Sequence, residues 1–179
     1  MRILKGKFAG RDLTSPGRAV RPTPEAMRDR ALALIEPELA GARVLDLFAG
    51  SGAIGLEALS RGARAVDFVE NGPAALHALK ANVAALRARD STRIFKRDVI
   101  PWIGNLEAGA YDVAYMDPPY GSRKLDLVLE RWKEIPFANV LLVEHDVDQE
   151  LPMKGRTHGF DGPTRITVLR ARSGPARRG

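Results

Sequence analysis

The fold is decided by residues 44–60, which read Val44-Leu45-Asp46-Leu47-Phe48-Ala49-Gly50-Ser51-Gly52-Ala53-Ile54-Gly55-Leu56-Glu57-Ala58-Leu59-Ser60. An apolar run of strand length comes first, a glycine-rich turn follows, and a helical pattern comes last. The glycines match the spacing G-x-G-x-x-G, which is typical of a helix start where backbone amides approach a nucleotide. Glu70 lies twenty residues after Gly50, where an acid can hold ribose hydroxyls. The stretch therefore predicts a nucleotide site at the edge of a parallel sheet.

Asp46 decides between two kinds of nucleotide. Taken alone, the glycine spacing indicates a nicotinamide dinucleotide, or glycines needed only for tight packing of the helix on the strand. A carboxylate directed at the turn would face the pyrophosphate of a dinucleotide, and like charges repel each other. The same carboxylate suits S-adenosylmethionine, which carries an ammonium group and a ribose but no phosphate. We expect this cofactor to bind at Asp46, Phe48, Ala49, Gly50, Ser51, Gly52, Glu70 and Asn71.

Short apolar runs alternate with helical patterns along the rest of the chain, as in a parallel α/β sheet. The expected strands are 44–48, 65–70, 92–95, 111–116 and 139–144, and the expected helices are 53–60, 73–88 and 125–133. Residues 156–160 and 164–170 flank Gly162-Pro163 and predict a closing hairpin. The expected fold is therefore a seven-stranded α/β sheet with one reversed strand.

The first forty residues differ from this pattern. Residues 2–8 and 11–14 can pair around Ala9-Gly10 as a small basic hairpin. Thr23-Pro24-Glu25 has the hydroxyl cap, the proline and the acid that are typical of a helix start, and Pro37 is expected to end that helix. We divide the chain into an extension packed on the main domain (1–40), the main domain itself (41–172) and a disordered tail (173–179).

The net charge of +6 is unevenly distributed. Residues 1–21 hold six basic side chains and one acid, and residues 151–179 hold seven and one, so the middle of the chain is acidic. Basic ends indicate a polyanionic partner, although charged ends that only keep the chain soluble are the alternative. The N-terminal part is expected to contact nucleic acid through Arg2, Lys5, Lys7, Arg11, Arg21 and Arg28.

A second motif, Asp117-Pro118-Pro119-Tyr120, follows the expected strand at 111–116. Two prolines end a strand, so the chain leaves the sheet at its carboxyl edge, where open α/β sheets bind ligands. The Asp117 carboxylate and the Pro118 carbonyl then become two acceptors for the hydrogens of an exocyclic base amine. Tyr120 offers a ring on which that base can stack. An Asp-Pro turn with a core tyrosine is the alternative when the motif stands alone.

Asp98 follows the third expected strand and has two compatible roles. It can accept a hydrogen bond from the adenine amino group of the cofactor, with Val99 beside it, and it can cap a helix that starts at Val99. His145 is expected to be a hydrogen-bonded structural residue. The chain has no cysteine and three histidines, so we expect no metal site. No apolar run approaches the ~20 residues of a membrane span.

Together these motifs resemble the bacterial 16S ribosomal RNA (guanine-N2)-methyltransferases, the RsmD-like family. The resemblance covers nearly the whole chain and rests on residues 46–63, Arg21-Pro22-Thr23, the basic residues 2–11, Asp117-Pro118-Pro119-Tyr120 and Val143-Glu144-His145. It implies a class I, Rossmann-like methyltransferase fold that uses S-adenosylmethionine to methylate the N2 amine of one guanine. It also implies that Gly50, Glu70 and Asp98 bind the cofactor. Asp117 and Tyr120 would then hold the guanine.

The implied reaction is a direct displacement in which the guanine nitrogen attacks the methyl carbon and S-adenosylhomocysteine leaves. Acceptors at Asp117 and Pro118 would stabilise the positive charge that grows on the amine, and stacking on Tyr120 would align it. The implied substrate is 16S ribosomal RNA within a small-subunit particle, and we expect a cytoplasmic monomer without a metal. Two alternatives stay open. One is methylation of another amine, in DNA adenine or protein glutamine, and the other is a non-catalytic RNA-binding assembly factor.

Overall fold

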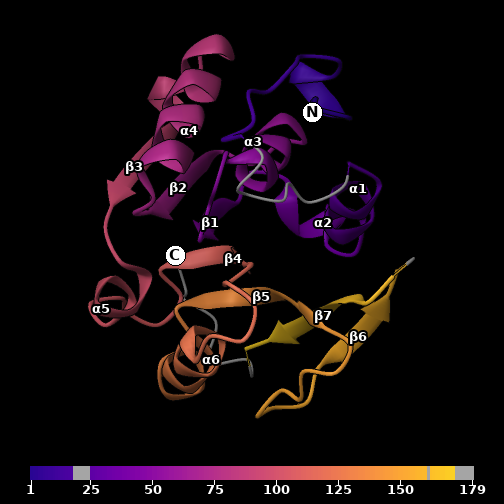
Figure 1. Cartoon of the computed structure of the whole chain (residues 1–179), viewed down its shortest axis with the longest axis vertical. Coiled ribbons are helices and arrows are strands. Elements are labelled where there is room, and N and C mark those ends of the chain that lie inside the picture. Colours follow the sequence, from indigo (N-terminus) through magenta and orange to yellow (C-terminus); the bar gives the residue numbers. More distant parts are fainter. Residues whose placement is uncertain (18–24, 161, 172–179) are drawn as a thin grey trace.

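A seven-stranded sheet lies at the centre of the computed structural model, which describes residues 1–17, 25–160 and 162–171 (Figure 1). The strand order across the sheet is β3-β2-β1-β4-β5-β7-β6. The strands are β1 Arg43–Leu47, β2 Ala65–Glu70, β3 Thr92–Lys96, β4 Tyr111–Met116, β5 Ala138–Asp146, β6 Arg156–Gly159 and β7 Thr164–Arg170. Strands β1 to β5 are parallel, and β7 runs antiparallel to both of its neighbours. The expected α/β sheet with one reversed strand is confirmed.

Helices cover both faces of this sheet. They are α1 Glu25–Ala33, α2 Glu36–Leu39, α3 Ala53–Ser60, α4 Pro73–Ala85, α5 Val99–Ile103 and α6 Lys124–Glu134, with 3-10 turns η1 Gly6–Phe8 and η2 Arg89–Ser91. Phe68 of β2 belongs to the apolar core that the sheet forms with α1 to α4, and Val143 of β5 belongs to the core formed with α5 and α6. Among the described helices, none is long and apolar enough to cross a membrane.

Two helix ends differ from the sequence expectation. Helix α4 ends at Ala85 instead of residue 88, because Arg87 adopts a positive φ of 53° and reverses the chain there. The expectation that Pro37 ends the first helix is wrong, since α1 already ends at Ala33. Pro37 lies in the first turn of α2, where its missing N–H is not needed. The expected helix start at Thr23-Pro24 and the tail at 173–179 lie outside the described residues.

The expected N-terminal hairpin forms only at its open end. Arg2 and Asp12 make an isolated antiparallel bridge. Beyond this bridge the chain turns through η1, so the paired strands expected at 2–8 and 11–14 are wrong. The physical reason lies in α3: the Glu57 carboxylate accepts hydrogen bonds from the N–H groups of Leu4 and Lys5, at 2.9 and 3.0 Å. The backbone of Leu4 and Lys5 is therefore bonded to a helix instead of a second strand, while Ile3 still pairs with Gly10 and Arg11.

A candidate cofactor and target-base site

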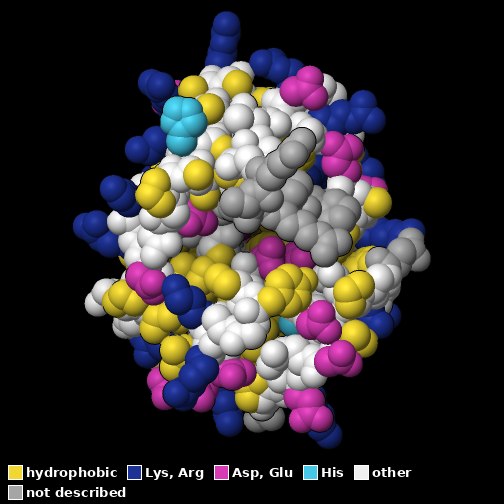
Figure 2. All heavy atoms as spheres, viewed as in Figure 1, with side chains coloured by type: hydrophobic (Ala, Val, Ile, Leu, Met, Phe, Trp, Pro, Cys, Tyr) yellow, Lys and Arg dark blue, Asp and Glu magenta, His cyan; other side chains and the backbone are white. Residues whose placement is uncertain are grey.

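Four acids lie where neighbouring parallel strands end. Glu70 ends β2, Asp46 lies in β1, Asp117 follows β4 and Glu144 lies near the end of β5. Because these strands are adjacent in the order β2-β1-β4-β5, the acids form a row along the carboxyl edge of the sheet. Figure 2 shows acidic side chains in a hollow near the middle of the side of the molecule in view. The expectation that Asp46, Glu70 and Asp117 meet at one edge is confirmed.

The turn between β1 and α3 depends on residues with positive φ. Phe48, Gly50 and Gly52 have φ values of 58°, 56° and 76°. A Cβ on Gly52 would approach the Leu79 side chain to 2.3 Å, and a Cβ on Gly55 would approach the Phe68 ring to 2.4 Å. These two glycines therefore serve packing. A Cβ on Gly50 would meet nothing within 4 Å, so the backbone there borders open space that a ligand can fill.

The Glu70 carboxylate is held firmly beside this turn. One oxygen accepts from the Gly50 N–H at 2.8 Å, and the other accepts from the N–H groups of Asn71 and Gly72 at 2.8 and 2.7 Å. The side chain stays half-buried, and the oxygen that bonds to Gly50 can accept a further hydrogen bond. The arrangement can therefore present a fixed carboxylate to a hydroxyl group of a ligand.

Asp46 is a buried carboxylate for which the described residues supply no cationic partner. Its exposed fraction is 2%, and one oxygen accepts from the Gly55 N–H at 3.0 Å. Burial raises the pKa of Asp46 well above its usual value, and the charges of Glu70 and Asp117 add to this rise. In the described part of the chain no Lys or Arg forms an ion pair with Asp46, Glu70 or Asp117. A cationic ligand would relieve this concentration of negative charge.

Asp98 caps α5, as the helix-cap interpretation predicted. One oxygen accepts from the Ile100 N–H at 3.0 Å, while the other pairs with the Lys124 ammonium at 2.8 Å. These two contacts, Lys124 first, lower the pKa of Asp98. The Lys124 nitrogen also lies 5.8 Å from the centre of the Phe48 ring. The Val99 side chain is buried in the core, so only its backbone is available to a ligand. The cofactor role of Asp98 stays a prediction.

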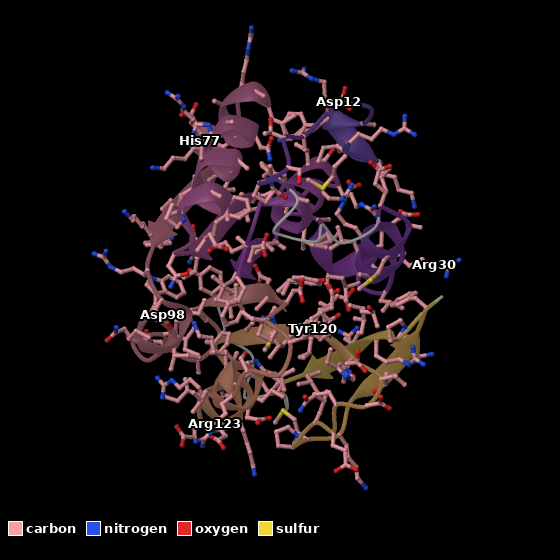
Figure 3. The ribbon with its side chains drawn as sticks, in the orientation of Figure 1. Asp12, Arg30, His77, Asp98, Tyr120 and Arg123 are labelled. Atoms are coloured by element: carbon pink, nitrogen blue, oxygen red, sulfur yellow. The ribbon has the colours of Figure 1, made fainter. Side chains whose placement is uncertain are left out.

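The loop after β4 exposes an aromatic ring beside a half-buried acid. Tyr120 is 62% exposed and lies near the middle of the molecule in Figure 3, so the alternative of a core tyrosine is wrong. Asp117 is half-buried, and burial raises its pKa to about 6. A pocket of about 290 Å³ adjoins this loop. It is lined by Pro118, Pro119, Tyr120, Gly121, Ser122, Leu125, Glu144, His145, Asp146, Asp148 and Gln149.

Glu144 belongs to this site, although the sequence analysis assigned it no role. It is 5% exposed, and one of its oxygens accepts a hydrogen bond from the Tyr115 hydroxyl. Burial, together with the charge of Asp117, raises the pKa of Glu144 to about 8, and the hydrogen bond from Tyr115 opposes this rise. The signal in the sequence was positional, since both Asp117 and Glu144 stand at the carboxyl ends of adjacent strands.

His145 is a structural residue, as expected. Its Nδ1 lies 2.8 Å from the Asp146 carbonyl oxygen, and its Nε2 lies 2.8 Å from the Thr167 hydroxyl. Because a carbonyl can only accept, Nδ1 donates to Asp146. The contact between Nε2 and the Thr167 hydroxyl holds the other side of the ring, so both nitrogens fix its orientation.

Arg28 cannot contact RNA, so its expected role is wrong. Its side chain is completely buried, with an ion pair to Glu57 at 3.4 Å and a hydrogen bond to the Arg2 carbonyl. Burial lowers the pKa of Arg28, although Glu57 opposes this shift. The residue instead fastens α1 and the N-terminal segment to α3. A buried partner 29 residues away cannot be recognised from a local charge pattern.

The other basic residues of the extension that the structure describes are exposed. Arg2 pairs with Glu25 at 3.6 Å, and Lys5 pairs with Asp29 at 2.7 Å. Exposed pairs of this kind are weak, so phosphate groups can compete for these cations. Lys7 lies over the Phe8 ring, and Arg11 donates to the Ala85 carbonyl. Arg21 lies outside the described residues. RNA binding by this surface stays a prediction.

Within the described ranges, no three His, Asp or Glu side chains are grouped so that they could hold a metal ion.

Comparison with known proteins finds relatives over most of the chain. The family model described as Conserved hypothetical protein 95 matches residues 1–159. Ribosomal RNA small subunit methyltransferase D of Escherichia coli strain K12 is 30% identical over 158 residues, which is 85% of this chain and 78% of that protein. YlbH of Bacillus subtilis strain 168, described as a candidate rRNA methyltransferase, is 32% identical over 159 residues, 85% of this chain and 86% of that protein.

Solved structures give the same result at the level of the fold. A hypothetical protein of Thermus thermophilus superimposes with a TM-score of 0.83 at 28% identity, covering 96% of this chain and 99% of its own. The Escherichia coli protein YhhF, described as a candidate methyltransferase, has a TM-score of 0.81 at 27% identity, covering 95% of this chain and 97% of its own.

Proposed function

We propose that this chain, which belongs to the RsmD-like family described as Conserved hypothetical protein 95, methylates the N2 amine of a guanine in 16S ribosomal RNA. Its sheet and helices form the class I S-adenosylmethionine-dependent methyltransferase fold. The observation that carries the proposal is the row of Glu70, Asp46 and Asp117, for which the described residues supply no cationic partner. The proposal of ribosomal RNA as the substrate rests on the named relatives. The proposal of the N2 position rests on the loop after β4 and on the family resemblance.

The acids beside the glycine turn fit S-adenosylmethionine. Its sulfonium and ammonium groups place two positive charges near Asp46, for whose buried carboxylate the described part of the chain supplies no counter-charge. Its ribose offers two hydroxyl donors to the fixed carboxylate of Glu70. The open space at Gly50 allows the ligand to approach the backbone. When bound, the cofactor supplies an electrophilic methyl group.

The loop after β4 fits the acceptor amine. The Asp117 carboxylate and the Pro118 carbonyl accept the two amine hydrogens and stabilise positive charge on the nitrogen as the new bond forms. The exposed ring of Tyr120 stacks on the base and limits the directions from which the nitrogen can react. Burial of Pro118 holds this loop against the domain. Positioning and charge stabilisation therefore account for the chemistry without a histidine base.

The test is methyl transfer from labelled S-adenosylmethionine to 16S RNA and to small-subunit particles, followed by identification of the modified nucleoside. We expect N2-methylguanosine at one position. Asp117→Asn should keep cofactor affinity and lower the transfer rate by about 10²–10³-fold, because one charged acceptor of the amine is removed.

The matched control is Asp90→Asn, an exposed acid of η2, which should leave the transfer rate unchanged. Methylated adenine in DNA or methylated glutamine, with RNA unmodified, would replace the proposed substrate. RNA binding without any methyl transfer would instead identify an assembly factor.

A further inference from the structure

Among the four acids at the carboxyl edge of the sheet, Glu144 has no role in the proposed methyl transfer. Met116 and Val143 are paired in the parallel register of β4 and β5. The residues that follow them, Asp117 and Glu144, are therefore next neighbours on strands that lie about 4.8 Å apart. The charge of Asp117 acts on Glu144, so the two acids form a carboxyl pair. Asp117 begins the loop after β4, and Glu144 lines the pocket beside that loop.

Where the structure describes them, the residues that face this pair are uncharged or acidic. Tyr115 of β4 donates to one oxygen of Glu144, and the described residues give that carboxyl no other hydrogen bond or ion pair. Ile166 of β7 lies opposite Glu144, and the neighbouring Arg165 directs its guanidinium to the backbone carbonyls of Gly162 and Thr164. Among the described residues, the other titratable groups nearby are Asp46 of β1, His145, and Asp146 and Asp148 at the pocket.

Acids placed this close do not ionise together. Burial raises the pKa of Asp117 to about 6, and burial with the charge of Asp117 raises the pKa of Glu144 to about 8. Between these values the two carboxyl groups together hold one proton and one negative charge, and the lower pKa of Asp117 favours the charge on Asp117 and the proton on Glu144. At neutral pH Asp117 is therefore ready to accept a proton and Glu144 is ready to release one.

Resting on the proposed function, we propose that Glu144 relays to the pocket the proton that Asp117 takes from the methylated amine. As the nitrogen forms its bond to the methyl carbon, the carbon–sulfur bond breaks and its electron pair stays on sulfur. An N–H bond of the amine then breaks, its electron pair stays on nitrogen, and the proton goes to Asp117. Glu144 releases its own proton to water in the pocket and accepts the proton from Asp117. Both acids are thereby returned to their starting states.

The geometry favours this route over direct loss from Asp117. A base stacked on Tyr120 would cover the half-buried Asp117, whereas Glu144 lines the 290 Å³ pocket together with Asp146 and Asp148. The hydrogen bond from Tyr115 fixes one oxygen of Glu144 and leaves the other oxygen for proton exchange. Glu144 acts through Asp117 and does not touch the reacting nitrogen, so it is a positioning residue.

The experiment compares single and multiple turnovers of Glu144→Gln. Glutamine has a similar size and can accept the hydrogen bond from Tyr115, but it cannot carry the carboxyl proton. The first methyl transfer should stay within about twofold of wild type, while steady-state turnover falls at least about tenfold. The expected time course is a burst of one methyl group per enzyme molecule. The steady-state pH profile should lose its dependence near pH 8, and the burst should keep its rise near pH 6.

Two further variants keep the test decisive. Glu144→Asp retains a carboxyl group and should restore part of the steady-state rate. This variant also tests the relay if the glutamine variant folds poorly. Asp148→Asn removes an exposed acid of the same pocket and should show no burst. An unchanged Glu144→Gln, or equal losses in the first and later turnovers, would overturn the relay alone. A wild-type protein that transfers no methyl group to RNA would overturn the proposed function and the relay with it.

Discussion

The buried carboxylate of Asp46 opposes the stability of the protein without its cofactor. Its pKa is raised in the folded state above the unfolded value of 3.8, chiefly by burial. Such a group contributes full stability at pH values below 3.8 and loses that contribution as the pH rises through its folded pKa. The folded protein therefore carries an unfavourable charge at the pH at which the ligand needs it.

Asp46→Asn should separate stability from binding. At pH 8 we expect the free energy of unfolding without cofactor to rise by about 1 kcal/mol or more, since one pKa unit corresponds to about 1.4 kcal/mol. The affinity for S-adenosylmethionine should fall about tenfold or more, because the cation loses its buried counter-charge. Urea unfolding and calorimetry measure the two effects. A variant that is less stable than the unaltered protein and binds S-adenosylmethionine equally tightly would contradict this assignment.

Single residues also show where sequence interpretation succeeds and fails. Asp46, Glu70 and Asp117 were placed correctly because strand ends and glycine spacing fix their positions along the chain. Arg28 was misplaced because its partner Glu57 lies in another helix, and a charge beside other charges looks the same whether it is exposed or buried. Glu144 received no role because its pairing with Asp117 depends on the register of two strands.

At the level of elements, Glu57 of α3 joins that helix to the N-terminal segment and to α1. This completely buried residue accepts from two backbone N–H groups of the N-terminal segment and pairs with Arg28 and Arg61. Glu57→Ala should lower the free energy of unfolding by about 3–5 kcal/mol, because it leaves a buried arginine without its counter-charge. Urea denaturation measures this change.

Glu36→Ala is the matched control for this helix. Glu36 pairs with the same Arg61 at 3.1 Å but is about half exposed, so its removal should change stability by less than about 1 kcal/mol. Equal effects of the two substitutions would show that the burial of Glu57 is energetically unimportant.

Elements with a strong local pattern were predicted closely, and those shaped by distant contacts were not. Strand β4 and helix α3 have the bounds that their apolar runs and flanking glycines indicate. The N-terminal hairpin forms only at its open end because α3 supplies hydrogen-bond acceptors that no local pattern reveals. Helix α4 ended early because an arginine, not a glycine, adopts the left-handed conformation at its end.

Over the whole molecule, the basic extension can be tested for contact with RNA. A variant with Arg2, Lys5, Lys7 and Arg11 changed to Gln should bind substrate RNA more weakly and keep its affinity for S-adenosylmethionine. Each RNA phosphate that no longer meets a cation should reduce the log–log salt slope of binding by about 0.7–0.9. Filter binding at several salt concentrations gives both quantities.

A control of equal charge makes the comparison specific. Four exposed basic residues elsewhere on the molecule, Lys80, Arg89, Lys133 and Arg156, can be changed to Gln in the same way. Similar reductions of RNA affinity in the two variants would show that total charge matters and that the position of the extension does not.

The attachment of residues 1–13 to α3 also determines when this segment can fold during synthesis. The carboxylate that bonds to the Leu4 amide belongs to a residue 53 positions later in the chain. At translation rates of about 5–20 residues per second, the ribosome needs about 3–10 s to reach it. During that interval Ile3 and Leu13, which are buried in the finished protein, have no core to enter. The nascent chain therefore exposes an apolar, basic segment beside the ribosome until α3 emerges.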